Sequence, residues 1–390
     1  MKYKVSKLAF GLLLVVAMVF LSACPSPTPQ ATQAVSEPTK APEEGPIPIG
    51  WSAPKSGTHA ILGEWDERGI LLAFEAKNAE GGIHGRELKL IQYDDEADPT
   101  KAVNIAEKLC TEDKVVAAFA CTNSTPTLAV VPVFAKYKVP HITGGLNAKI
   151  TQQGSHYVFR NTAAGPIYEK SIVDYMVEQG YTKFAIIADN SAYGQGQADY
   201  QENALEAHGL KALVRETYAG DDKDFTGQLT KIMQADPEVL LFAGSEVASG
   251  LIAKQARAMG FEGEFAGGAA VGTPKFIEVA GDASEGVHFS SPYITNDLND
   301  MTRDFAKRYE ERWGEPPESH GAKAYDGAMM LIQALEACAP DNINGECIAD
   351  EMHKICGYQG LQGEFCYDET GEGIQAISIG VIENGELKPL

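Results

Sequence analysis

The chain has 390 residues, and its 54 acidic side chains outnumber the 32 basic ones, giving a formal net charge of -22. Hydrophobic residues make up 44% of the sequence, an ordinary value for a globular protein, and the length is sufficient for two domains of typical size. Because the sequence has no basic stripe to neutralise phosphates, nucleic acid is not expected as a partner.

The N-terminus has the pattern of an export signal. Lys2, Lys4 and Lys7 are followed by an uncharged, largely apolar run from Leu8 to Ala23. A basic start, an apolar run and small residues before a cleavage point are typical of a secretory signal peptide. The run is also shorter than the roughly 18 residues of a membrane-spanning helix. We therefore predict that residues 1–23 are a signal peptide.

The cysteine that follows this run is expected to carry a lipid. Leu21-Ser22-Ala23-Cys24 resembles the bacterial lipobox, in which the signal peptidase cleaves before a diacylglycerol-bearing cysteine. An ordinary signal peptide with a coincidental cysteine is the alternative. Pro25 to Pro46 is rich in proline and lacks aromatic residues, so residues 24–46 are expected to form a disordered leash. The chain would then be lipid-anchored to the bacterial cell membrane on its extracytoplasmic side, either in the periplasm or on the outer surface of the cell.

Six cysteines remain once Cys24 is assigned to lipid, and an even number in an exported chain favours disulfides. Four of them occur late in the sequence, in surroundings that indicate a helix end, a loop, a helix and a strand in turn. We predict bonds between Cys338 and Cys347 and between Cys356 and Cys366, although four cysteines allow three pairings.

The two earlier cysteines are expected to be free thiols. Cys110 lies at the end of a predicted helix, at the bottom of a sheet, whereas Cys121 ends the next predicted strand at its top. Such a separation makes a disulfide between them hard to form. Both cysteines are therefore predicted to lie in the core as thiols.

Short runs rich in Val, Ile and Phe alternate with longer segments of helical period from Ile47 onward. This alternation predicts an α/β fold with parallel sheets. A long helix is expected over Ala60 to Glu80, ended by Gly81 and Gly82. The expected strands are Ile47 to Trp51, Leu88 to Tyr93, Val115 to Ala120, His141 to Thr143, Phe184 to Ala188, Ala212 to Thr217, Val239 to Ala243, Glu264 to Gly267 and Gly286 to Phe289.

Two acidic stretches indicate an internal duplication. Tyr93 to Pro99 and Tyr218 to Phe225 each follow a predicted strand and precede a predicted helix. We therefore expect two similar doubly wound lobes. Sheets of this kind bind ligands outside the carboxyl ends of their strands, so two facing lobes would form a cleft there. A hinge between lobes would also allow closure over a small solute.

The sequence gives no signature of a cofactor, a metal or a catalytic centre. Gly194 to Asp199 lacks the third glycine of a dinucleotide fingerprint, and no phosphate loop or nucleophile elbow is present. The eight histidines are scattered without metal-ligand spacing. We expect no cofactor, no metal site and no enzymatic activity.

A set of short motifs in a fixed order resembles periplasmic leucine/isoleucine/valine-binding proteins over nearly all of the chain after the leash. Singly each motif is weak, but their order and spacing together are specific. The motifs are Asn78 to Arg86, Tyr93 to Pro99, Thr122 to Thr125, Val158 to Thr162, Ala192 to Gly196, Gln255 to Gly260, Ala280 to Gly286 and Ala324 to Gly327.

This resemblance implies the solute-binding component of an ABC importer for branched-chain and hydrophobic amino acids, with the type I periplasmic-binding fold. The chain would cross between lobes near Thr162, Ser291 and Cys366. Residues 47–162 and 292–366 would then form lobe 1, and residues 163–291 and 367–390 lobe 2. The implied partners are a small ligand, an amino acid or a relative of one, and the ABC permease subunits.

The resemblance also assigns ligand contacts. In the family, the loops that correspond to Thr122 to Thr125 and to Thr143 to Asn147 hold the ligand's carboxylate and ammonium groups. The roles are carried to Thr122, Asn123, Gly145 and Asn147. Free N-H groups at a helix start would favour the carboxylate. An ordinary helix cap and an ordinary loop remain the alternative.

Aromatic residues of relatives against the ligand correspond to Tyr193 and Tyr325. An aromatic ring at such a position lines an apolar wall while its hydroxyl group finds a polar partner. Packing within a lobe is the alternative for both tyrosines. The same mapping places Asp189 and Asp326 near the cleft, where helix capping is the alternative role.

One departure from the family bears on the ligand. Relatives that bind branched-chain amino acids have a glutamate after the strand corresponding to Glu264 to Gly267, and it pairs with the ligand's ammonium group. Here Gly268, Ala269 and Ala270 follow instead. Glu246 is the candidate replacement, although a carboxylate at a helix start is also favoured by the helix dipole. The first-lobe tyrosine of relatives corresponds to Leu62.

The sequence therefore predicts a lipid-anchored solute receptor of an ABC importer that binds a small amino acid or a related carboxylate or amide. A ligand-sensing module that signals to a membrane partner shares the fold and is the alternative. An extracellular enzyme would need a nucleophile beside a base, or a metal cluster.

Overall fold

The computed structural model describes residues 45–294 and 299–390. The predicted signal peptide, Cys24 and all of the predicted leash except Gly45 and Pro46 lie outside these residues. Within the described part of the chain, no helix has the length and apolar character needed to cross a membrane.

The first half of the chain builds a parallel five-stranded sheet with the order β2-β1-β3-β4-β5. Four of its strands were predicted to within two residues at each end, whereas β5 was not predicted as a strand. The strands are β1 (Ile47–Ala53), β2 (Leu88–Asp94), β3 (Ala117–Ala120), β4 (His141–Thr143) and β5 (Val158–Arg160).

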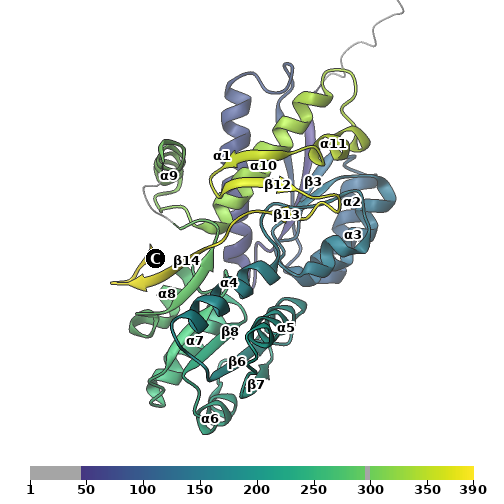
Figure 1. Cartoon of the computed structure of the whole chain (residues 1–390). Coiled ribbons are helices and arrows are strands. Elements are labelled where there is room, and N and C mark those ends of the chain that lie inside the picture. The colour runs from purple at the N-terminus through teal and green to yellow at the C-terminus, as the bar shows by residue number, and fades with distance from the viewer. Residues whose placement is uncertain (1–44, 295–298) are drawn as a thin grey trace, which may run out of the picture. The chain divides into compact units, whose positions relative to one another are not determined.

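Helices from both ends of the chain cover this sheet. Helix α1 packs along α10, and α2 packs along α3, as Figure 1 shows. Trp51, Phe74 and Phe119 are among the apolar side chains buried between the sheet and helices α1 and α10. The elements are α1 (Ala60–Ala79), α2 (Pro99–Thr111), α3 (Ser124–Tyr137), η1 (Ala148–Gln153), α9 (Asp300–Trp313), α10 (Ser319–Cys338) and α11 (Gly345–Met352).

Helix α1 stops where the glycine pair predicts. Gly81 and Gly82 both have positive φ angles, and their N-H groups donate to the carbonyl oxygens of Asn78 and Lys77, each at 3.0 Å. Glycine adopts this left-handed conformation without the cost of a side chain, so the last carbonyl groups of the helix are satisfied and the chain turns.

The middle of the chain and its last residues together build a seven-stranded sheet with the order β15-β14-β10-β9-β8-β6-β7. Strands β6 to β10 are parallel, and β14 and β15 are antiparallel additions at one edge. The strands are β6 (Phe184–Asp189), β7 (Val214–Tyr218), β8 (Val239–Ala243), β9 (Glu264–Gly267), β10 (His288–Ser291), β14 (Ser378–Glu383) and β15 (Glu386–Pro389). Its helices are α4 (Gly165–Glu178), α5 (Ala192–Ala207), α6 (Thr226–Gln234), α7 (Glu246–Ala258), α8 (Pro274–Ala280) and η2 (Gly281–Ser284).

The two sheets repeat one topology. The order β2-β1-β3-β4-β5 corresponds strand for strand to β7-β6-β8-β9-β10. In each sheet the strand order reverses once, between β1 and β3 and between β6 and β8. The expected duplication and the α/β class are therefore confirmed. A doubly wound sheet opens a crevice at such a reversal, outside the carboxyl ends of the two strands.

The third crossing of the chain, which leads back to the seven-stranded sheet, lies later in the sequence than the predicted position near Cys366. Strands β11 (Cys356–Gly360), β12 (Gly363–Tyr367) and β13 (Gly373–Ile374) form a third, three-stranded sheet. Cys366 lies within β12, where it pairs with Ile374. The crossing therefore falls between Ile374 and Ser378 rather than near Cys366, because a further strand returns to the small sheet first.

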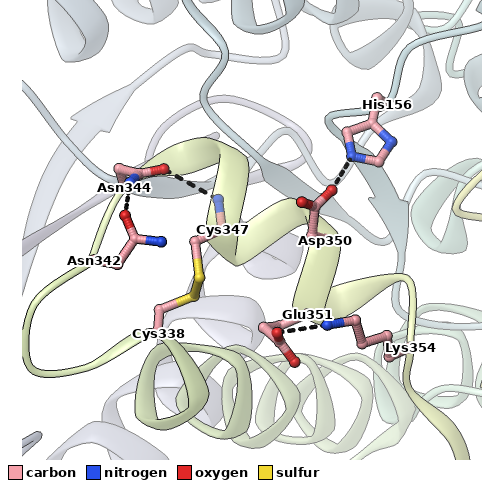
Figure 2. Close-up of a disulfide and its surroundings, with 8 residues drawn as sticks. All are labelled: His156, Cys338, Asn342, Asn344, Cys347, Asp350, Glu351 and Lys354. Atoms are coloured by element: carbon pink, nitrogen blue, oxygen red, sulfur yellow. Dashed lines mark hydrogen bonds and ion pairs between the residues drawn. A yellow bond between two sulfur atoms is a disulfide. The ribbon is translucent and has the colours of Figure 1, made fainter.

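Both predicted disulfides are present. Cys338 at the end of α10 is bonded to Cys347, and Cys356 is bonded to Cys366 across β11 and β12 (Figure 2 shows the first). Two of the expected surroundings were wrong, since Cys347 lies in α11 rather than a loop and Cys356 begins β11 rather than lying in a helix. Asn344 caps α11 by accepting from the Cys347 N-H group at 3.1 Å, which starts that helix before the cysteine.

The other two cysteines of the described chain are free, as predicted. Cys110 lies near the end of α2, and Cys121 follows β3 directly. Burial raises the pKa of both thiols, that of Cys110 to about 12. Neither is therefore a reactive thiolate at neutral pH.

The close approach of α1 and α10 gives a stability test. A side chain at Gly69 would place its Cβ atom 2.2 Å from the Gly321 carbonyl oxygen. Gly69→Ala should therefore destabilise the fold by at least about 2 kcal/mol, since overpacking outweighs the better helix propensity of alanine. Urea unfolding measures the change. Gly227→Ala in α6 is the control, because nothing lies within 4 Å of its Cβ position, and it should be neutral or slightly stabilising.

Candidate ligand-binding site

A cavity of about 280 Å³ lies at the carboxyl ends of both sheets. His59 and Leu62 follow β1, and Thr122 to Pro126 follow β3, on either side of the first reversal of strand order. Asp189 ends β6 and Glu246 follows β8, on either side of the second reversal. The cavity thus occupies the place where a doubly wound sheet holds its ligand, for both sheets at once.

The start of α3 forms one wall of the cavity. Asn123 is the N-cap residue in an extended conformation, yet its side chain makes no capping hydrogen bond. Its Oδ1 atom accepts instead from the Thr122 hydroxyl group at 3.2 Å. The first N-H groups of α3 therefore have no side-chain cap from Asn123, and the positive end of the helix dipole lies at the cavity. Such a helix start favours an anion.

Two carboxylates line the cavity from the seven-stranded sheet. Glu246 is the first residue of α7, only 5% exposed, and within the described part of the chain its carboxylate makes no hydrogen bond or ion pair. Asp189 is 6% exposed and accepts from the Ser191 N-H group at 2.8 Å. This wall is therefore negative and favours a cation, although the helix dipole also accounts for an acid at the first position of α7.

Lys323 lines the cavity from α10 and was not predicted. It is 5% exposed, and its Nζ atom donates to the Gly144 carbonyl oxygen at a long 3.4 Å. Burial lowers the pKa of this ammonium group, since removal of water disfavours the charged form. His59 and His320 lie at the same cavity. No motif signals such a lysine, because its position depends on how α10 packs against the five-stranded sheet.

Four of the predicted ligand residues line this cavity, namely Thr122, Asn123, Tyr193 and Glu246. Leu62, Ala269 and Ala270 line it as well. The loop after β9 therefore brings two alanines and no acidic side chain to the cavity. Leu62 gives the cavity an apolar surface, together with Leu146 and the Tyr193 ring.

Gly145 and Asn147 do not line the cavity. The Gly145 N-H group donates to the Thr143 hydroxyl at 3.0 Å, and the adjacent Gly144 takes the lining position. The Asn147 amide donates to the Ala192 carbonyl oxygen at 2.6 Å, and its Oδ1 atom accepts from the Lys149 N-H group. Asn147 therefore links η1 to α5 and caps η1.

Tyr325 and Asp326 lie away from the cavity as well. The Tyr325 hydroxyl accepts from Arg308 at 3.1 Å, and its ring packs against Phe305 at a centroid distance of 5.0 Å. The Asp326 carboxylate accepts from the N-H groups of Leu361 and Gln362, which join β11 to β12. Their roles are packing and holding a turn, because the side of α10 that carries them faces its neighbouring elements rather than the cavity.

Hydrogen bonds join the elements of the two sheets beside the cavity. The Thr125 hydroxyl, at the start of α3, accepts from the Ala192 N-H group at 3.2 Å, at the start of α5. The Tyr200 hydroxyl of α5 accepts from the Ala148 N-H group at 2.9 Å. Together with Asn147, these contacts hold α3 and η1 against α5.

Comparison with known proteins identifies the family. A family model described as periplasmic binding protein matches residues 46–386. The chain belongs to this family. Its members are extracytoplasmic binding proteins rather than enzymes, and the match spans nearly all of the described chain.

Among curated relatives, the leucine-, isoleucine-, valine-, threonine- and alanine-binding protein of Pseudomonas aeruginosa is 31% identical over 332 residues, 84% of this chain and 87% of that protein. An amino acid binding protein of the same organism is 33% identical over 335 residues, again 84% of this chain and 87% of that protein. The predicted relationship to leucine/isoleucine/valine-binding proteins is confirmed.

Solved structures support the fold. The leucine-binding protein LivK of Thermotoga maritima matches with a TM-score of 0.82 and 27% identity, over 88% of this chain and 97% of that one. LivJ of Streptococcus pneumoniae, solved with isoleucine, matches with a TM-score of 0.82 and 25% identity, over 88% and 99%. The chain has the type I periplasmic-binding-protein fold.

A buried acid beneath the cavity gives a pH test. Glu169 is fully buried, accepts from Gln197 and Gln201, and lies against Gly268, next to the lining residue Ala269. Burial raises its pKa from 4.5 to about 8. The folded protein therefore keeps a proton that the unfolded chain releases above about pH 4.5. Its stability should decline as pH rises through this window, by on the order of several kcal/mol at about 1.4 kcal/mol per pKa unit, and level off above pH 8.

Glu169→Gln should remove that decline, because an uncharged amide replaces the protonated acid. Urea unfolding at several values between pH 5 and pH 9 measures the effect. Glu262→Gln, at an exposed position shortly before β9, is the matched control and should keep the wild-type slope. Parallel stability curves for Glu169→Gln and wild type would show that Glu169 is ionised in the folded protein.

Proposed function

We propose that this chain is the solute-binding receptor of an ABC importer and captures a small amino acid between two lobes, one on each large sheet. The observation that carries the proposal is the opposite charge of the two cavity walls. Helix α3 and Lys323 make the first wall positive, whereas Glu246 and Asp189 make the second negative. A zwitterion spanning the cavity satisfies both walls. The names of the relatives, which bind amino acids, agree with this chemistry.

The proposed ligand is small. A cavity of about 280 Å³ lies at the lower end of the roughly 300 to 1,000 Å³ that is typical of small-molecule sites. This suits an amino acid with a short or medium side chain. Leu62, Leu146 and the Tyr193 ring would contact its apolar part, and Thr122, Asn123 and the start of α3 would hold its carboxylate.

Closure of the two lobes is part of the proposal. The hydrogen bonds that Ala192 makes with Thr125 and Asn147 bring the starts of α3 and α5 together at the cavity. A ligand touching both walls would favour this arrangement, because it adds contacts that an open cleft lacks. Ligand capture here makes and breaks no covalent bond, and release would occur to the permease subunits.

A thermal-shift screen tests the receptor function. The purified chain should gain roughly 2.7 kcal/mol of stability from an amino acid present at a hundred times its dissociation constant. Related carboxylates without an amine should bind more weakly, because they leave Glu246 buried and unpaired. The absence of a shift with every amino acid, carboxylate and amide would reject the proposal.

Glu246 is the proposed partner of the ligand's ammonium group. Glu246→Gln should weaken the binding of an amino acid by more than about tenfold, since a charge-assisted hydrogen bond contributes about 1.5 to 3 kcal/mol. Isothermal titration calorimetry with the ligand from the screen measures the loss. Glu262→Gln, at an exposed position that does not line the cavity, should bind as wild type does. An unchanged affinity in Glu246→Gln would leave the carboxylate with only its role at the helix start.

The lipid anchor on Cys24 is also a proposal, supported by the lipobox resemblance of residues 21–24. Cys24→Ser should abolish the incorporation of radiolabelled fatty acid into the chain and release it from the membrane fraction. Labelling of cells that express either form measures this. Persistent labelling of the serine variant would place the lipid elsewhere.

A further inference from the structure

Among the described residues, Lys323 is the one lysine that lines the ligand cavity, and two acidic residues, Asp189 and Glu246, line it as well. Its ammonium group has a single hydrogen bond to the described chain, the long contact with the Gly144 carbonyl oxygen. An ammonium group can donate three hydrogen bonds, and a buried one is costly without a counter-charge. The group therefore has unused donors at the cavity.

Neighbouring acids do not occupy these donors. Asp66, Glu318 and Glu246 act on Lys323 through space, yet none of them forms an ion pair with it within 4.0 Å in the described structure. Asp66 accepts from the Trp51 indole at 3.0 Å, and burial raises its pKa to about 6. Glu318 accepts from the backbone N-H groups that start α10 and contacts the His320 ring. Both acids are thus engaged elsewhere.

The neighbouring loop leaves room for the ammonium group. A Cβ atom at position 144 would lie 2.7 Å from Cε and 2.9 Å from Nζ of Lys323. Gly144 has an ordinary negative φ angle, so backbone conformation does not require glycine there. The absence of a side chain at Gly144 is what admits the end of Lys323 to this position beside the cavity.

The charges of the lining residues indicate what complements Lys323. Asp189, Glu246 and Lys323 line the cavity, in addition to the positive start of α3. A ligand with one carboxylate and one ammonium group supplies an opposite charge to each wall. A dicarboxylate without an amine would leave Glu246 and Asp189 without a cationic partner and would add like charge.

We propose that Lys323 binds the ligand's carboxylate directly as an ion pair and thereby makes the receptor select acids over the corresponding amides. This inference rests on the proposed function and narrows its ligand class to amino acids with a free carboxylate. An amide of the same shape offers no charge to Lys323, so the buried ammonium group gains no direct ion-pair partner in that complex. The penalty for an unpaired buried charge makes this discrimination large.

The test compares an amino acid with its own primary amide. Wild type should bind the acid at least about tenfold more tightly than the amide, as the loss of a charge-assisted hydrogen bond predicts. In Lys323→Met the affinity for the acid should fall by more than about tenfold, and the preference for acid over amide should shrink to within about threefold. Isothermal titration calorimetry gives both affinities, and the ligand-free unfolding transition of each variant reports whether it is folded.

Two further variants separate the ion pair from a general disturbance of the site. Gly144→Ala displaces the ammonium group without removing it, so it should also reduce the preference for the acid. Lys254→Met, at an exposed position of α7, is the matched control and should keep the wild-type preference.

The outcomes are distinguishable. A wild-type protein that binds no amino acid would reject the proposed function and this inference with it. A wild-type protein that binds acid and amide equally well would overturn the inference alone. The same holds if a folded Lys323→Met variant keeps the wild-type preference. Loss of the preference in Lys323→Met and Gly144→Ala, with Lys254→Met unchanged, would establish the ion pair.

Discussion

Parallel strands impose the constraint on which the rest of this structure depends. All strands of a parallel run end at one edge of the sheet, and the helix that follows each strand starts at that edge. The carboxyl ends of the strands, the positive ends of the helix dipoles and the polar loop residues therefore lie together at this edge. Because the fold repeats this arrangement in two sheets, two such edges border one cavity. The charge of each wall then follows from the start of α3 after β3 and from the acids at the ends of β6 and β8, together with Lys323 from α10.

Most of the fold could be predicted from the sequence because strong local signals specify it. Strands β4, β8 and β9 match their predicted bounds, since buried parallel strands read as apolar runs between turn residues. In the small sheet, the strand at Cys366 (β12) was predicted, whereas β11 and β13 were not, because these short strands are rich in glycine and have no continuous apolar run. The pairing within this sheet depends on partners brought together by the disulfide and by Asp326.

The candidate site was only partly predictable. Thr122 and Glu246 lie directly after strands, so topology alone brings them to the cavity edge. Lys323 lies within the first turns of α10, a helix that enters from a distant part of the sequence. The burial of Lys323 beside the cavity depends on the close approach of α1 and α10 at Gly69 and Gly321, and on the missing side chain at Gly144. Tyr325 lies two residues further along the same helix, yet that displacement rotates it away from the cavity.

The order of elements along the chain also decides when the protein can become complete. The seven-stranded sheet takes β14 and β15 from the last residues, and the five-stranded sheet takes its covering helix α10 from after residue 318. Neither half therefore has all of its own elements until nearly the whole chain is available. Such contacts between distant segments slow folding. An incomplete N-terminal portion therefore lacks elements of both cores, and the order of the elements makes completion of either sheet depend on the last part of the chain.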